Sequence, residues 1–159
     1  MVDINSSHQR WIFVAQATNK PGTITAAAAV FSNRGVSLEG ILGSAINTTA
    51  EEGRLLLSFR ANKEKKDLLL RSLQRLPSIA EVAAYAYEDT RLRAVAVAKV
   101  SLKAQIDHNL NALYTEVILK EKDTLLLLLS GGTEAVEDAI AHFRKQNQLQ
   151  DVVMSTITV

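Results

Sequence analysis

The stretch ATNKPGTITAAAAVFSNRGVSLEG, from Ala17 to Gly40, decides the architecture of the first half of this 159-residue chain. Its alanine-rich centre repeats apolar residues at helical spacing, which predicts a helix with one apolar stripe. The stripe consists of Ile24, Ala27, Ala28 and Phe31. Pro21 suits the first turn of that helix, where the N–H that proline lacks would have no partner. Gly35 lies where a left-handed C-terminal cap is expected.

Runs of β-forming residues surround this helix and predict the remaining elements of the first half. The predicted strands are Arg10 to Ala17, Leu38 to Asn47, Arg54 to Arg60 and Ile79 to Tyr87. A second helix follows Asn62, whose side chain can cap it, and Pro77 ends it. The order β-α-β-β-α-β is that of the split β-α-β fold, an antiparallel four-stranded sheet with both helices on one face.

The second half of the chain repeats the same order. Its predicted strands are Leu92 to Val100, Tyr114 to Lys120, Thr124 to Ser130 and Asp151 to Val159. One helix is predicted over Lys103 to Leu113, and a second begins where Thr133 can cap it. We therefore expect an α+β chain of two tandem ferredoxin-like domains, residues 8–88 and residues 91–159, with no long linker between them.

The strand Thr124 to Ser130, with the sequence TLLLLLS, is apolar at successive positions. Such a pattern is typical of a strand that is buried on both faces. Helices cover only one face of the predicted sheet, so the other face should pack on another sheet, a second subunit or a different protein. Leaving it in water would forgo several kcal/mol, at about 25 cal/mol per Å² of apolar surface.

Composition and charge argue against several classes of protein. Eighteen basic and seventeen acidic residues leave a net charge of +1, which is not the basic footprint of a nucleic-acid-binding protein. The absence of cysteine excludes a disulfide framework and a thiolate zinc site. The longest apolar run, Leu125 to Leu129, is too short to cross a bilayer, and the first residues do not resemble a signal peptide. We expect a cytoplasmic protein without nucleic-acid or membrane partners.

Residues that could carry out catalysis are sparse. His8, His108 and His142 lack the spacing of metal ligands, and no pair of nucleophile and base is apparent. We therefore expect no catalytic residue, no metal and no cofactor. Residues 130–133, with the sequence SGGT, lie between a predicted strand and a predicted helix but lack the Lys-Ser/Thr pair of a phosphate loop. A tight turn followed by a helix cap is the better interpretation.

The loop before the first helix is the best candidate binding site. Asn19 offers a side-chain amide, and Gly22 allows close approach to the backbone. The N–H groups of Gly22, Thr23 and Ile24 should point out of the helix start, where they could hold a carboxylate. A plain turn with a helix cap explains the same residues, and without further information it is the favoured interpretation.

The segment NKPGTITAAAAVFSNRGVSLEGILGSAI, residues 19–46, resembles the signature of ACT domains, most of all that of the regulatory (small) subunit of acetolactate synthase. The matching residues are Asn19, Pro21, Gly22, Ile24, Phe31, Arg34, Gly35, Val36 and Leu38. The later segment ALYTEVILKEKDTLLLLLSGGTEAVEDAI, residues 112–140, is similar to the C-terminal domain of that family. The resemblance extends from Gln9 to Val159.

This resemblance implies a regulatory subunit that is not itself an enzyme. Such subunits form homodimers, bind a branched-chain amino acid such as valine between two copies, and modulate the thiamine-diphosphate-dependent catalytic subunit of acetolactate synthase. The carboxylate and amine of the ligand would be held by Asn19, Gly22, Thr23 and Ile24. Ser37 and Leu38 of the partner subunit would close the pocket. The alternative is a free-standing, amino-acid-sensing ACT protein that acts on a transcriptional or transport system.

Three residues depart from the family pattern. Ala26 stands where arginine is usual, Gly40 stands where serine is usual, and Ser37 replaces an asparagine that grips the ligand across the interface. These departures bear on the identity and affinity of the ligand, whereas the expected fold and class of partner do not depend on them.

Overall fold

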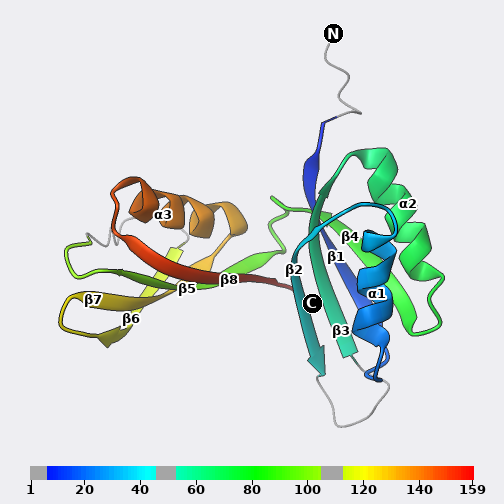
Figure 1. Cartoon of the computed structure of the whole chain (residues 1–159), viewed down its shortest axis with the longest axis horizontal. Coiled ribbons are helices and arrows are strands. Elements are labelled where there is room, and N and C mark those ends of the chain that lie inside the picture. The colour runs from blue at the N-terminus through cyan, green and yellow to red at the C-terminus, as the bar shows by residue number, and fades with distance from the viewer. Residues whose placement is uncertain (1–6, 46–52, 105–112) are drawn as a thin grey trace. The chain divides into compact units, whose positions relative to one another are not determined.

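The structure, a computed structural model, describes residues 7–45, 53–104 and 113–159. The chain forms two compact units, Met1–Tyr87 with Val159 and Glu88–Thr158 (Figure 1). Each unit has its own four-stranded sheet and its own hydrophobic core. Within the described residues, no helix combines the length and the apolar composition that crossing a membrane requires.

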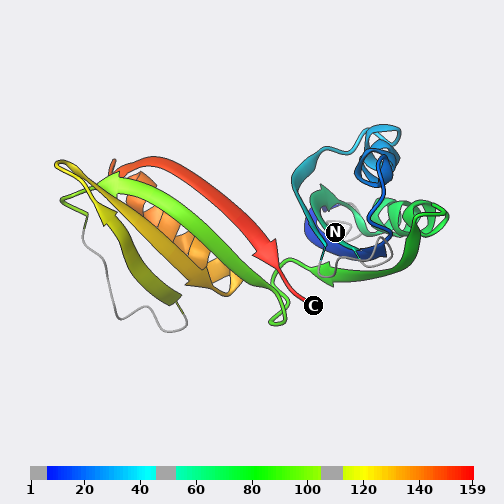
Figure 2. The same cartoon turned by 90° about the horizontal axis from the view of Figure 1, so that it is seen from below.

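The first unit has the predicted β-α-β-β-α-β order. Its elements are β1 (Gln9–Ala17), α1 (Thr23–Ser32), β2 (Leu38–Ala45), β3 (Gly53–Ala61), α2 (Lys63–Gln74) and β4 (Ile79–Ala86). The strands lie in the order β2-β3-β1-β4, and all neighbours are antiparallel. Both helices lie on the same face of the sheet (Figure 2). The ferredoxin-like fold predicted from the sequence is therefore confirmed in this unit.

The second unit repeats this topology. Its elements are β5 (Arg93–Ser101), β6 (Leu113–Lys120), β7 (Thr124–Gly131), α3 (Thr133–Lys145) and β8 (Leu149–Ile157). The strand order β6-β7-β5-β8 matches that of the first unit position by position, and all neighbours are again antiparallel. The helix predicted over Lys103 to Leu113 lies mostly outside the described residues. Of its two ends, Lys103 is in a turn and Leu113 begins β6.

Three phenylalanine rings form the centre of the first core. Phe13 of β1, Phe31 of α1 and Phe59 of β3 are each at most 1% exposed. The Phe59 ring makes edge-to-face contacts with both others, with centroid distances of 4.7 Å to Phe13 and 5.0 Å to Phe31. Such contacts add roughly 0.5–1.5 kcal/mol per pair to the gain from burial. The cluster thereby fixes α1 on the sheet.

The core of the second unit lies between α3 and one face of its sheet. Leu125, Leu127 and Leu129 of β7 are buried there. The residues of α3 that pack against this face are Val136, Ala139, Ile140 and Phe143. The alternate residues Leu126 and Leu128 are only half-buried, because they lie on the other face of the sheet.

The start of α1 differs from the prediction. Pro21 is not in the first helical turn, because Gly22 is the N-cap. The Thr23 N–H donates to the Lys20 carbonyl at 3.2 Å, and Gly22 has φ 87° and ψ −14°. These features define a type II turn with proline at its second and glycine at its third position. The fixed φ of Pro21 therefore serves the turn rather than the helix.

The end of α1 agrees with the prediction. Gly35 has a φ of 67°, in the left-handed region. Its N–H donates to the Ser32 carbonyl, and the Val36 N–H donates to the Phe31 carbonyl, both at 3.0 Å. This pair of bonds is the Schellman motif, which satisfies carbonyls that the helix leaves free.

The two other predicted caps have opposite outcomes. Asn62 caps α2, and its Oδ1 accepts the Lys65 N–H at 2.8 Å. Thr133 does not cap α3, because the N-cap is Gly132 and no side chain bonds to that helix start. Thr133 is instead the first residue of the helix and is only 3% exposed. The N-cap is one residue earlier than predicted, so Thr133 lies within the helix.

We predict that Asn62→Ala lowers the free energy of unfolding by about 1 kcal/mol, because α2 loses its side-chain cap. Urea unfolding followed by circular dichroism measures this change. Asn33→Ala, at an exposed position after α1, is the matched control and should change stability by less than about 0.5 kcal/mol. Equal unfolding midpoints for both variants would show that the cap contributes nothing.

Candidate functional site

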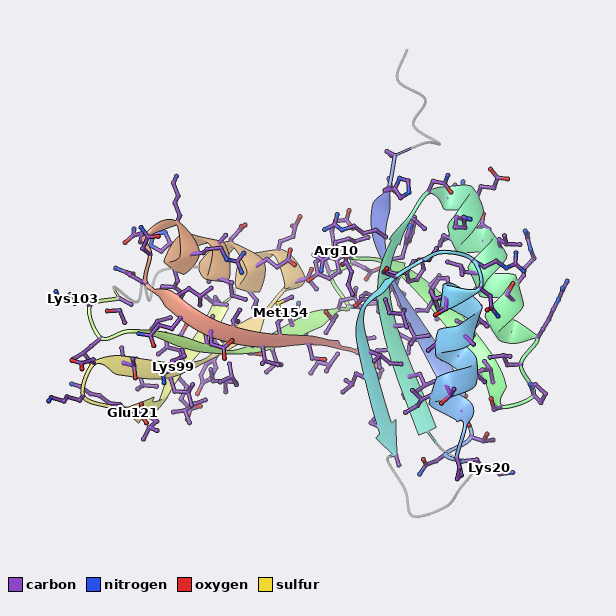
Figure 3. All side chains as sticks on the ribbon, in the orientation of Figure 1. Arg10, Lys20, Lys99, Lys103, Glu121 and Met154 are labelled. Atoms are coloured by element: carbon purple, nitrogen blue, oxygen red, sulfur yellow. The ribbon has the colours of Figure 1, made fainter. Side chains whose placement is uncertain are left out.

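The loop between β1 and α1 is held by its own hydrogen bonds. The Thr18 N–H donates to the Ser78 carbonyl at 2.9 Å, which ties the loop to the segment before β4. The Lys20 N–H and the Thr23 hydroxyl both donate to the Thr18 carbonyl, each at 3.0 Å. The loop therefore presents Asn19 from a defined backbone, at the lower end of α1 in Figure 3, where Lys20 is labelled.

The predicted donors of this loop are not equivalent. The Thr23 N–H is used within the type II turn, and the Thr23 side chain is 6% exposed and bonded to Thr18. Thr23 therefore supports the loop. Gly22 is exposed, and apart from its two chain neighbours no described residue has an atom within 4 Å of the place where a Cβ would stand. Since no side chain caps α1, its first turn leaves backbone N–H groups for another partner.

A small cavity lies beside this loop. Its volume is about 150 Å³, and among the residues that line it are Asn19, Lys20, Thr23, Ile24, Gly43 and Arg54. This volume is on the order of five times the ~30 Å³ share of one water molecule in the liquid. Typical pockets for drug-sized ligands start at about 300 Å³. The cavity is therefore smaller than the pockets that hold drug-sized ligands.

Two glycines allow the strands to approach the loop. A Cβ on Gly53 would stand 2.9 Å from the Ala17 carbonyl oxygen and 3.6 Å from the Asn19 Cβ. A Cβ on Gly43 would stand 3.3 Å from the Ile24 Cδ1 atom. Both glycines line the cavity. Larger residues there would push the loop and Ile24 away from the sheet.

Among the residues that the structure describes, the charged ones that line the cavity are both basic. They are Lys20 from the loop and Arg54 from β3. Arg54 lies opposite Gln16 of β1 and Ser44 of β2, so β-sheet register brings it to the loop from far along the chain. Two cations and a helix start favour a carboxylate. Arg54 was not predicted from the sequence, and only the pairing of β3 with β1 could have indicated it.

Ser37 and Leu38 do not join this cavity in a single chain. They line a separate, open hollow of about 470 Å³ at the other end of α1, together with Ala28 and Phe31. The ten residues of α1 span about 15 Å at 1.5 Å per residue. The structure thus brings Asn19, Thr23 and Ile24 together, places Gly22 next to them, and leaves Ser37 and Leu38 apart.

One departure from the family pattern has a local explanation. A Cβ on Gly40 would stand 2.8 Å from the Ser58 hydroxyl oxygen. That hydroxyl donates to the Gly40 carbonyl at 3.3 Å. A serine at position 40 would therefore require Ser58 to rotate and to give up this bond.

Among the groups that the structure describes, those with shifted pKa values lie away from the cavity. Hydrogen bonds from Arg91 lower the pKa of Asp89 to about 2, and the bond from Lys66 lowers that of Asp67. The negative charge of Glu116 raises the pKa of Tyr114. Each of the three groups is at the surface, beside its charged neighbour. Among the described residues, no group of three or more histidine or acidic side chains could hold a metal ion.

Comparison with known proteins shows likeness in structure but not in sequence. No protein-family model and no curated protein matches the chain. The acetolactate synthase small subunit from Thermotoga maritima matches with a TM-score of 0.70 at 16% identity, covering 95% of this chain and 98% of that chain. The regulatory subunit of aspartate kinase from Thermus thermophilus matches with a TM-score of 0.45 at 14% identity, covering 89% and 97%. The first likeness shows that this chain has the fold of two tandem ferredoxin-like domains of ACT type.

Proposed function

We propose that this chain is a regulatory, non-catalytic subunit that binds a small branched-chain amino acid such as valine and modulates a thiamine-diphosphate-dependent acetolactate synthase. The observation that carries the proposal is the end-to-end likeness to an acetolactate synthase small subunit. The ACT signature on residues 19–46 supports it independently. The proposal keeps the cytoplasmic location that the sequence favours.

The cavity beside α1 supports an amino acid as the ligand. Its cations, Lys20 and Arg54, and the free N–H groups at the helix start suit a carboxylate. Ile24 and Leu55 line the same space and offer apolar contact to an aliphatic side chain. The Asn19 side chain can accept a hydrogen bond from an amino group. The site therefore contains a complement for each part of valine.

A homodimer would complete this site. Among the described strands β2 is at the edge of the first sheet, so one of its sides has no strand neighbour there and can pair with another strand. Ile24 and Ile41 lie beside that edge and are 50% and 45% exposed. Pairing of two β2 strands about a two-fold axis would cover these side chains. It would also offer Ser37 and Leu38 of the partner subunit to the cavity.

Calorimetric titration with L-valine tests the ligand site. The wild-type chain should bind weakly, and Ser37→Asn should bind about threefold to tenfold more tightly, because a carboxamide restores a hydrogen bond worth roughly 0.5–1.5 kcal/mol. Valine at 100 times its dissociation constant should stabilise the protein by about 2.7 kcal/mol. If neither protein binds valine or another small amino acid, the site is no sensor, and a role in assembly alone would remain.

The backbone site can be tested by adding charge at Gly22. Gly22→Asp should abolish valine binding, because its carboxylate repels that of the ligand. Gly22→Asn has the same shape and experiences the same left-handed φ, which asparagine tolerates, so it controls for strain. We expect Gly22→Asn to retain measurable binding of valine in the same titration. Equal affinities for the two variants would contradict a carboxylate at this position.

The homodimer can be tested at the β2 edge. Ile41→Lys should halve the mass of the assembly in light scattering at micromolar concentration, since two lysines would meet at the interface. Gln74→Lys adds the same charge at an exposed position of α2 and should leave the mass of the assembly unchanged. A wild-type chain that is monomeric at this concentration would contradict the dimer.

A further inference from the structure

A basic hollow lies on the first unit, at the end of α1 opposite the Asn19 loop. It is open, with a volume of about 470 Å³, and is formed by the loop between α1 and β2 and by the junction of β3 with α2. Apart from His8, the charged residues that line it are Arg34, Glu39, Arg60 and Lys65. Among the described lining residues, three cations thus face one carboxylate, which leaves a surplus of two positive charges.

The carboxylate of Glu39 is already engaged. Its Oε1 accepts the Arg60 Nε–H at 2.7 Å, and its Oε2 accepts the Arg10 Nε–H at 2.8 Å. The two arginines lie directly opposite each other on β1 and β3, where like charges repel. Glu39 bridges them from β2, at an irregularity of the strand pairing between Leu38 and Gly40. Irregularities that re-aim a side chain are frequent beside functional sites.

The other two cations keep donors without a strong acceptor. The Lys65 Nζ donates to the Arg34 carbonyl, and the Arg34 Nη2 donates to the Ser72 hydroxyl, both at 3.4 Å. These distances exceed those of good hydrogen bonds. Neither Arg34 nor Lys65 forms an ion pair with a described carboxylate. Both side chains carry several N–H donors and no acceptor, so the hollow offers its donors to a ligand rich in acceptors.

A phosphate group matches this chemistry. It carries a charge of about −1.5 to −2 at pH 7 and three strong acceptor oxygens, so it balances the surplus of two positive charges. A single carboxylate would balance only one of them. Arginine also binds phosphate through paired N–H donors. The N-cap of α2, Asn62, lines the hollow, so the positive end of that helix adds to the attraction.

We propose that the basic hollow binds a small phosphate-bearing molecule through Arg34, Arg60 and Lys65. Its volume exceeds the about 300 Å³ at which pockets for small organic ligands begin, so it has room for a phosphate and an attached group. The hollow lies within the first unit and shares no lining residue with the amino-acid cavity of the same chain. The inference therefore goes beyond the amino-acid-binding function and does not depend on it.

Calorimetric titration of the full chain with inorganic phosphate, diphosphate and glycerol 3-phosphate, at constant ionic strength, tests the proposal. Wild type should bind these anions, and Lys65→Gln should bind them about tenfold more weakly, the loss expected for one charge-assisted hydrogen bond. Lys65→Arg should retain binding, because arginine also donates to phosphate. Lys63→Gln is the matched control: it removes the same charge from an exposed position in the first turn of α2 and should bind as wild type does.

The three probes also distinguish the source of the phosphate. Tighter binding of glycerol 3-phosphate than of inorganic phosphate would indicate a phosphate ester, and equal binding would indicate free phosphate. Circular dichroism of each variant should match that of wild type. Should Lys65→Gln unfold, Arg34→Gln serves in its place, with the same expected loss.

Three results would overturn the proposal. The first is that no probe binds to wild type at millimolar concentration. The second is an equal loss for Lys63→Gln and Lys65→Gln, which would reveal only a general attraction of anions to the start of α2. The third is preferential binding of a polyglutamate peptide, which would assign the hollow to an acidic protein. Titration of wild type with valine tests the proposed function separately, so either proposal can fail while the other stands.

Discussion

The contact among Phe13, Phe31 and Phe59 fixes α1 on the first sheet, and the candidate site depends on that position. Phe31 packs against both other rings, and its carbonyl also accepts the Val36 N–H that ends the helix. One residue thus anchors the helix and shapes its last turn. Because the Asn19 loop precedes α1 and Ser37 follows it, the same contact places both halves of the proposed amino-acid site.

The site uses backbone geometry where an enzyme would use reactive side chains. The type II turn at Pro21 and Gly22 turns the chain into α1, and the bonds of Thr18 hold that turn. These hydrogen bonds order the loop when the protein folds. Binding a ligand there would therefore cost little additional conformational entropy. The proposed regulation requires that a ligand held by this loop favour one state of an assembly over another.

The sequence was most informative where structure is local. Strand and helix periodicity predicted both β-α-β-β-α-β units, and the caps at Gly35 and Asn62 follow from residues within one helical turn. Two helix starts were predicted wrongly: Pro21, expected in the first turn of α1, belongs to the type II turn before it, and α3 begins with Gly132 as its N-cap instead of Thr133. Arg54, with Gly43 and Gly53, was missed because the register of distant strands brings these residues to the loop. Whether Ser37 and Leu38 complete the site depends on a second chain, which periodicity does not describe.

Among the described residues, α1 and α2 pack on one face of the first sheet and α3 packs on one face of the second (Figure 2). The central claim is that amino-acid binding at α1 controls a catalytic partner through the proposed assembly. The most direct measurement is the rate of acetolactate formation by the catalytic subunit from the same organism, alone, with this chain, and with this chain and valine. We predict that the chain raises the rate and that valine lowers it only when the chain is present. A rate that neither addition changes, with the chain in excess, would contradict the account.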